Sequence, residues 1–398
     1  MTQSNIQWRR LAGIMAVQSS ITLAWVIYSL YLPDLLIKLG FAKTLAGTLL
    51  IIEHGLEAAI EPIFGGLSDR SQGEIGSRFP WISLGVVLAA SFFIALPIIV
   101  FYVPSGSIWR WIFPAIAVLW ASAMAIFRSP VVTLLGQISP QPQLPIAASG
   151  LTLAQQLVRA VRFSAYGLIL SWGPFFAFAL GSCVILGAAT YLRKVMPPPL
   201  PQPRAKNLTP KRLPLISPRN LATIVGTGIA IGWGLRFLFA TLGPIFATQL
   251  GSDRVSSGML GFSLLLAFTA LPAGALASKI GNAKAMLGGL VMTAILLVAI
   301  SFNSSMILLA IGLLLMSFTF STVLNGMVPF VLDLVPEQRA GLGIGSYFGA
   351  FSGAISFFDL FFAGLKTLSL KASFGAIALL LAAVLVAIAQ KYKLNGDR

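Results

Sequence analysis

Long apolar segments separated by short polar ones run along the whole chain. A helix needs about 20 mostly apolar residues to cross a bilayer, and the apolar segments reach that length repeatedly. We expect about twelve such helices. Their predicted ranges are 11–36, 44–67, 80–103, 109–137, 145–170, 173–192, 221–248, 255–278, 283–302, 305–332, 341–365 and 372–390. The pattern therefore predicts an all-α integral membrane protein.

The pattern changes in the middle of the chain. Residues 193–220 are basic and rich in proline, and they contain no acidic residue. We predict that they form an extended linker between a six-helix half over residues 1–192 and a second over 221–398. The run Gly65 to Arg70 follows the second predicted helix as a short charged turn, and Gly274 to Lys279 follows the eighth. This echo indicates an internal repeat, and hence two pseudo-symmetric halves.

Composition supports a membrane protein. Hydrophobic residues make up 57% of the 398 residues and charged residues 10%, and ordinary soluble domains are far less apolar. The formal net charge of +16 does not indicate nucleic-acid binding, because Lys and Arg lie in short segments between apolar runs, mostly on one side. The positive-inside rule then puts both termini in the cytoplasm. We expect a bacterial plasma membrane, a first helix that is retained rather than cleaved, and a monomer.

Candidate chemistry is concentrated in the second predicted helix. Glu53, Glu57 and Glu61 recur every four residues, so each step turns about 40° and the three carboxylates form one narrow stripe. His54, the single histidine of the chain, lies three residues before Glu57. A charge at the centre of a membrane helix costs roughly 2.5–3.5 kcal/mol, so these side chains must face protein or a wet cavity. They could carry a coupling proton or cation, or they could simply pair with arginines that hold the helix bundle together.

The segment 57–81 resembles a known family. Gly65, Leu67, Ser68, Asp69 and Arg70 resemble the loop motif of the major facilitator superfamily, with Arg78 after a short insertion. Arg78-Phe79-Pro80-Trp81, and two acids four apart before Pro62, look like the glycoside-pentoside-hexuronide cation symporters and the related sucrose transporters. The resemblance implies the major facilitator fold, coupling to H⁺ or Na⁺ through Glu57 and Glu61, and no bound cofactor. Glu53 and His54 complete the predicted coupling group.

Other polar and aromatic side chains inside the predicted helices are candidates for contacting substrate. Guanidinium groups suit fork-like contacts with hydroxyls or carboxylates, and aromatic faces stack on sugar rings. The predicted substrate-binding residues are Gln18, Trp25, Tyr28, Arg128, Arg159, Arg162, Trp233, Arg236 and Asp359. Gly65, Asp69, Arg70 and Arg78 lie at the membrane edge, where we expect them to act in gating rather than in binding.

These observations favour a carrier that works by alternating access between its two halves. The predicted activity is cation-coupled symport of a sugar or glycoside. The alternative is a pigment-handling or assembly protein of the same superfamily that transports no sugar. An enzyme is disfavoured, because the sequence has no phosphate-binding loop, no metal-ligand cluster and no soluble domain. The one cysteine, Cys183, excludes an intramolecular disulfide and a multi-cysteine metal site.

Overall fold

The computed structural model describes residues 5–197 and 213–396, and all regular structure in them is helical. The long helices of the first half are α1 (Trp8–Lys38), α2 (Leu45–Ile75), α3 (Phe79–Tyr102), α4 (Ile112–Thr133), α6 (Leu144–Ser164) and α8 (Pro174–Val195). Those of the second half are α9 (Pro218–Leu250), α10 (Val255–Ile280), α11 (Asn282–Ser301), α12 (Met306–Leu334), α13 (Ala340–Ser356) and α15 (Leu368–Gly396). The predicted all-α class is confirmed.

Short elements complete the chain. Helices α5 (Leu135–Ile138), α7 (Tyr166–Ser171) and α14 (Phe358–Phe362) continue α4, α6 and α13 after a local interruption. Single 3-10 turns are η1 (Ile108–Trp111), η2 (Gln141–Gln143), η3 (Ser252–Arg254) and η4 (Glu337–Arg339). The predicted linker 193–220 is shorter than expected, since α8 extends to Val195 and α9 begins at Pro218. Its middle part, residues 198–212, lies outside the described residues.

One local prediction was wrong. The run Gly65 to Arg70 was expected to be a turn, but α2 continues through it and ends at Ile75. Gly76 then stops the helix with φ +70°, the left-handed conformation that glycine adopts without steric cost. The extra turns keep Ser68 and Asp69 on the buried side of a regular helix, where both side chains are almost fully covered.

Polar helices lie where the two halves meet. Among the described residues, nine helical stretches are long and apolar enough to cross a membrane. Helices α2, α6 and α13 are not among them: α2 and α6 carry charged residues, and α13 has only 17 residues. Helix α2 packs on α13, and α6 packs on α10 and α12, so these contacts join the first half to the second. The charged residues of α2 and α6 thus lie on helices that have protein as well as lipid around them.

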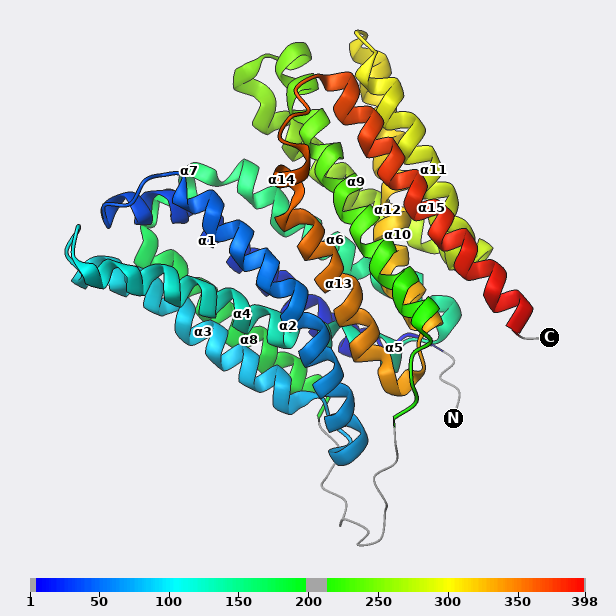
Figure 1. The fold of residues 1–398 in the computed structure, drawn as a ribbon, viewed down its shortest axis with the longest axis horizontal. Helices are drawn as coiled ribbons and strands as arrows, with labels where there is room; N and C mark the ends of the chain where they lie inside the picture. The colour runs from blue at the N-terminus through cyan, green and yellow to red at the C-terminus, as the bar shows by residue number, and fades with distance from the viewer. Residues whose placement is uncertain (1–4, 198–212, 397–398) are drawn as a thin grey trace, which may run out of the picture.

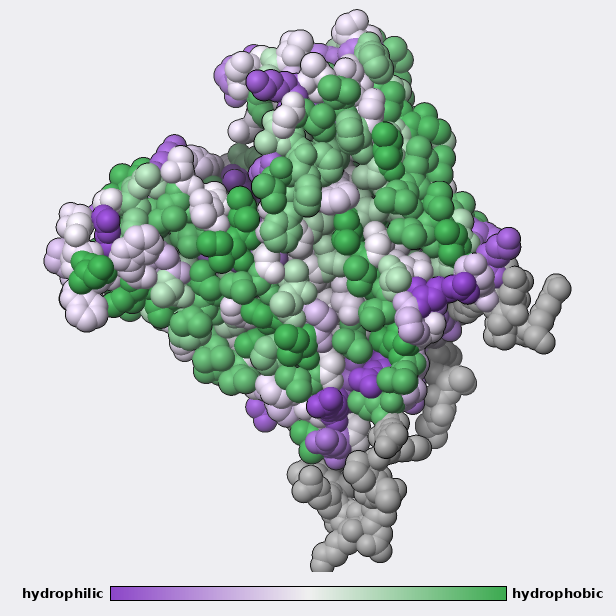
Figure 2. All heavy atoms as spheres, viewed as in Figure 1, coloured by the Kyte–Doolittle hydropathy of each residue, from purple (hydrophilic) through white to green (hydrophobic). Residues whose placement is uncertain are grey.

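The two groups of helices meet at one end and diverge at the other. Figure 1 shows them closest near the lower part of α13 and diverging toward the opposite end, where α7 and α14 lie. Figure 2 shows a recess between the lobes at this diverging end, with hydrophilic residues in it and apolar residues on the flanks. The molecule therefore has one closed and one open end.

Glycines allow the closed end to pack tightly. A Cβ on Gly65 would overlap the carbonyl oxygen of Gly341, and a Cβ on Gly345 would overlap the carbonyl oxygen of Glu61. Gly349 makes a similar approach to the carbonyl oxygen of Ala58, at 2.7 Å from its Cβ position. Helices α2 and α13 therefore touch backbone to backbone, which is the packing that small residues at four-residue spacing favour.

Candidate functional site

The three carboxylates of α2 are buried, as their spacing requires. Glu53 and Glu61 have no exposed surface, and Glu57 is 2% exposed. Helix α2 packs on α1, α4 and α13, so all three side chains lie among neighbouring helices. Because buried carboxylates need partners, the groups around them determine what the stripe can do.

Arg128 of α4 lies between the two inner carboxylates. Its Nη1 atom is 3.0 Å from Oε1 of Glu61 and 3.7 Å from Oε2 of Glu57. His54 Nδ1 lies 3.2 Å from the same Glu57 oxygen. The guanidinium also stacks over the ring of Phe348 on α13, at 5.0 Å from its centroid. We call Glu57, Glu61, Arg128 and His54 the inner cluster.

The inner cluster has room for one more positive charge. When both carboxylates are ionised, a single guanidinium faces two negative groups. The Oε2 atom of Glu61 is buried and has no hydrogen-bond partner among the described residues. A proton on His54 or on one of the carboxylates, or a small cation, would balance the charge. Among the described residues, Arg128 is the one candidate arginine that pairs with the glutamates of α2.

Glu53 has a different environment. The hydroxyl of Tyr28 on α1 donates to Glu53 Oε1, while Glu53 Oε2 is buried without a partner in the described part of the chain. Tyr28 is itself completely buried and packs on Trp120, with ring centroids 4.5 Å apart. In this conformation the hydroxyl of Tyr28 is therefore engaged by Glu53, and its predicted contact with substrate stays a prediction.

Trp25 also belongs to this aromatic group. Its ring stacks on His54 at 5.2 Å and lies 4.8 Å from Trp120. Trp25 retains partial exposure, in contrast to Tyr28. On the neighbouring part of α1, Gln18 is buried and its Oε1 accepts a hydrogen bond from Gln155 Nε2 of α6 at 3.1 Å.

Two further arginines of the first half lie on α6. Arg159 and Arg162 are both exposed, and neither forms an ion pair within residues 5–197 and 213–396. The charged neighbour that acts on Arg159 is Arg128, so Arg159 lies close to the inner cluster without joining it.

The second half contributes a separate polar pair near the open end. Arg236 Nη2 of α9 lies 3.2 Å from Asp359 Oδ2 of α14 and stacks over Phe358 at 4.9 Å. Both side chains are accessible, at 40% and 64%. They line a pocket together with Lys371. The Trp233 indole donates to the Ala354 carbonyl at 3.0 Å, so its N–H is occupied in this conformation.

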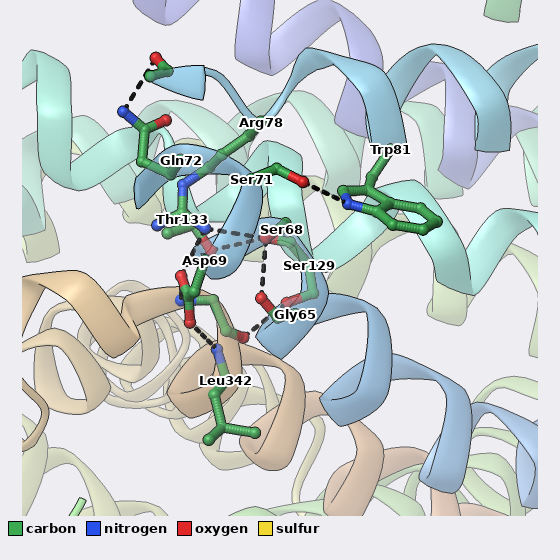
Figure 3. A network of polar contacts seen from close by, with 12 residues as sticks. Gly65, Ser68, Asp69, Ser71, Gln72, Arg78, Trp81, Ser129, Thr133 and Leu342 are labelled. Atoms are coloured by element: carbon green, nitrogen blue, oxygen red, sulfur yellow. Dashed lines mark hydrogen bonds and ion pairs between the residues drawn. The ribbon is translucent and has the colours of Figure 1, made fainter. Parts of the chain in front are cut away.

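The predicted gating residues lie at the closed end, and one of them spans the two halves. Asp69 of α2 accepts from the backbone N–H groups of Gly341 and Leu342, both at 2.8 Å. These amides are in the first turn of α13, where backbone donors have no helical partner and the helix dipole favours a negative charge. Figure 3 shows Asp69 pointing at this helix start.

Arg78 completes this contact. Its Nη1 atom is 2.6 Å from Asp69 Oδ1 and 2.8 Å from Ser68 Oγ, and its side chain is 2% exposed. Ser129 of α4 adds a bond from its hydroxyl to the Gly341 carbonyl at 3.1 Å. Arg70, by contrast, points to the exposed side of α2. We call Asp69, Arg78, Ser129 and the start of α13 the latch.

Sequence reasoning did not single out Trp120, Phe348, Gln155 or Ser129. Trp120 and Phe348 look like ordinary apolar positions, and only the packing of α4 on α1 and of α13 on α2 shows their contacts. Gln155 had a signal, because it lies four residues before Arg159 and therefore on the same face of α6. Ser129 adjoins Arg128, but its bond to α13 depends on the close approach of the halves.

Comparison with known proteins agrees with this architecture. Residues 224–395 match the family model described as the Major Facilitator Superfamily. No curated protein sequence matches the chain. The human organic anion transporter MFSD10 (TETRAN) has a similar structure, with TM-score 0.70 and 15% identity over 95% of this chain and 99% of that one. A bacterial homologue of the iron transporter ferroportin, in an outward-facing state, gives 0.68 and 16% over 96% and 99%.

At such low identity the solved structures show the fold alone, and they distinguish no branch of the superfamily. They extend the likeness across both halves, whereas the family model covers most of the second half. Most of the second half of the chain therefore matches the Major Facilitator Superfamily model, and the chain as a whole has the all-helical membrane-protein fold of these solved transporters.

Proposed function

We propose that the protein is a cation-coupled symporter in which Glu57 and Glu61 bind the coupling ion. The observation that carries this proposal is the sharing of one guanidinium, that of Arg128, by two buried carboxylates. A purely structural salt bridge would be balanced one to one. Here the excess carboxylate makes uptake of a proton or cation favourable, and it lies on a helix that contacts the opposite half.

The two ends of the molecule support alternating access between residues 1–192 and 221–398. In the present conformation the latch joins α2, α3 and α4 to α13 at the closed end, while the lobes diverge at the other. The described ends of the chain and the residues that flank the basic linker, at the end of α8 and the start of α9, lie on the latch side in Figure 1. We therefore assign that side to the cytoplasm by the positive-inside rule. This conformation is then outward-facing, and breaking the latch accompanies opening toward the cytoplasm.

A sugar or glycoside remains the substrate class that the sequence favours. Partly exposed Trp25 and Trp233 are available for stacking, one in each half. Glu57 is the best single group to test, because it contacts both Arg128 and His54 and so connects every member of the inner cluster.

Uptake of labelled mono- and disaccharides into proteoliposomes tests the proposal. Inward gradients of H⁺ and of Na⁺ are imposed separately on wild type, Glu57→Gln and Glu74→Gln. Glu74 is a matched control, since it is a carboxylate of the same helix that is exposed. We expect one gradient to drive uptake in wild type and in Glu74→Gln but not in Glu57→Gln. Gradient-driven uptake that survives in Glu57→Gln would show that this carboxylate is not the coupling group.

A further inference from the structure

Helix α6 carries two solvent-accessible arginines that no carboxylate of the described residues balances. Arg159 and Arg162 are both exposed, and the described residues contain no acidic side chain within ion-pairing distance of either. The neighbours that act on them electrostatically are the guanidinium of Arg128 and the phenol of Tyr166. By contrast, Arg128 of the inner cluster and Arg78 of the latch each pair with a carboxylate.

The two guanidinium groups are close enough to act together. Residues three apart on a helix have Cβ atoms about 5–6 Å apart on one face, so two long side chains can converge on a single group. Gln155 lies on the same face, and its bond to Gln18 at 3.1 Å turns that face toward α1. Helix α6 then ends at Ser164 and continues as α7, which Figure 1 places at the end where the lobes diverge.

A structural role explains only part of this arrangement. Arg162 is in the last turn of α6, where a positive charge interacts favourably with the helix dipole, but Arg159 is not in that turn. Both lie near the end of α6 that leads to α7 and away from the latch, on the side where the positive-inside rule disfavours arginine. Intramembrane charges of this kind are retained mostly along substrate pathways.

We propose that Arg159 and Arg162 bind an anionic group, a carboxylate or a phosphate, on the transported solute. This inference rests on the proposed symport function and names the chemical class of its substrate. Guanidinium groups form bidentate, charge-assisted hydrogen bonds with both kinds of anion. An acidic sugar satisfies this requirement and the sequence-based expectation together.

Arg159 is close enough to Arg128 for the two charges to interact, which also explains how such a solute is coupled to the ion. An anion held at Arg159 brings negative charge beside a cluster that already has one carboxylate in excess. That charge strengthens the binding of a proton or cation to Glu57 and Glu61, and by reciprocity the bound ion strengthens the binding of the anion. Joint binding of the two is the thermodynamic requirement for symport.

Binding and transport are tested with pairs of probes that differ by one anionic group. The pairs are glucuronate and glucose, gluconate and glucitol, and glucose 6-phosphate and glucose, with inorganic phosphate and sulfate as minimal anions. Ligand-induced stabilisation of the purified full chain and gradient-free counterflow in proteoliposomes are measured for wild type, Arg159→Gln, Arg162→Gln and Arg159→Lys. Arg254→Gln is the control, because Arg254 is exposed and lies in the other half.

We expect at least one anion to bind more tightly than its neutral partner. Affinity should fall about 10- to 100-fold in the two glutamine variants, less in Arg159→Lys, and not in the control. Equal binding of neutral partners, indifference to both arginines in variants shown to be folded, or no binding of any anion would overturn the proposal. If uptake of a neutral solute required Glu57, the symport proposal would stand and the anion-binding proposal would fall. If anion counterflow required the arginines but no ion gradient drove uptake, the anion-binding proposal would stand and the symport proposal would fall.

Discussion

Gly65 of α2 and Gly341 of α13 cross so closely that a methyl group on Gly65 would overlap the Gly341 carbonyl oxygen. The two residues belong to opposite halves, and the Asp69 contact to the start of α13 lies one turn away. The closed end of the molecule therefore depends on backbone packing as much as on charge.

Gly65→Ala should disfavour the closed conformation, because overpacking of a tight contact typically costs about 1–3 kcal/mol. Gly66→Ala is a matched control, since the nearest atom to its Cβ position is Leu342 Cδ1 at 3.7 Å, an ordinary contact. Spin labels at the exposed positions Glu74 and Glu337, in a Cys183→Ser background, would report the separation of α2 from η4. We expect a longer distance for Gly65→Ala only. Identical distance distributions in the two variants would show that α2 and α13 accommodate the added methyl group by a local shift, without opening the closed end.

Removing Asp69 should destabilise the protein mainly through Arg78. Arg78 is 2% exposed, so without Asp69 it becomes a buried charge with no acidic partner, a defect that costs about 3–5 kcal/mol. The double variant Asp69→Ala/Arg78→Gln should therefore have a higher apparent Tm than Asp69→Ala alone, although both should transport poorly because the latch is lost. A double variant no more stable than the single one would mean that the Asp69 bonds to the α13 backbone dominate.

Arg128→Gln should likewise be rescued by neutralising a partner. Without the guanidinium, Glu57 and Glu61 are two buried carboxylates whose one remaining basic neighbour among the described residues is His54. We expect Arg128→Gln to lower the apparent Tm strongly, and Arg128→Gln/Glu61→Gln to recover much of the loss. Addition of Glu74→Gln in place of Glu61→Gln should recover nothing, because Glu74 is exposed. If both double variants recovered the apparent Tm equally, the net charge of the protein would explain the effect, and the 3.0 Å contact between Arg128 and Glu61 would not.

The Arg236–Asp359 pair should behave differently, although its 3.2 Å separation resembles that of a strong ion pair. Its side chains are 40% and 64% exposed, and pairs in contact with solvent contribute about 0–1 kcal/mol. Asp359→Asn should therefore change the apparent Tm by only a few degrees, in contrast to Asp69→Ala. A large loss of stability would mean that Asp359 has a structural role at the α13–α14 interruption.

Local pattern was sufficient for much of the fold. Apolar runs predicted the long helices to within a few residues at most ends, and four-residue spacing placed Glu53, Glu57 and Glu61 on one buried face. The same reasoning failed at Gly65 to Arg70, because glycines and charges there suggested a turn. The α2 backbone stays helical because these glycines pack on α13 and Asp69 bonds across the interface.

The sequence by itself determined the class of protein, the approximate helices, the acidic stripe and the basic linker, because each depends on residues near one another along the chain. Only the tertiary structure decided that Arg128 serves Glu61 across 67 positions and that Asp69 reaches Gly341 across 272. It also decided that Arg159 and Arg162 have no acidic partner in the described part of the chain. Helical periodicity says which face a side chain is on. Which neighbouring helix that side chain contacts depends on how closely the backbones of α2, α4 and α13 approach one another. Glycine packing between distant segments sets that distance.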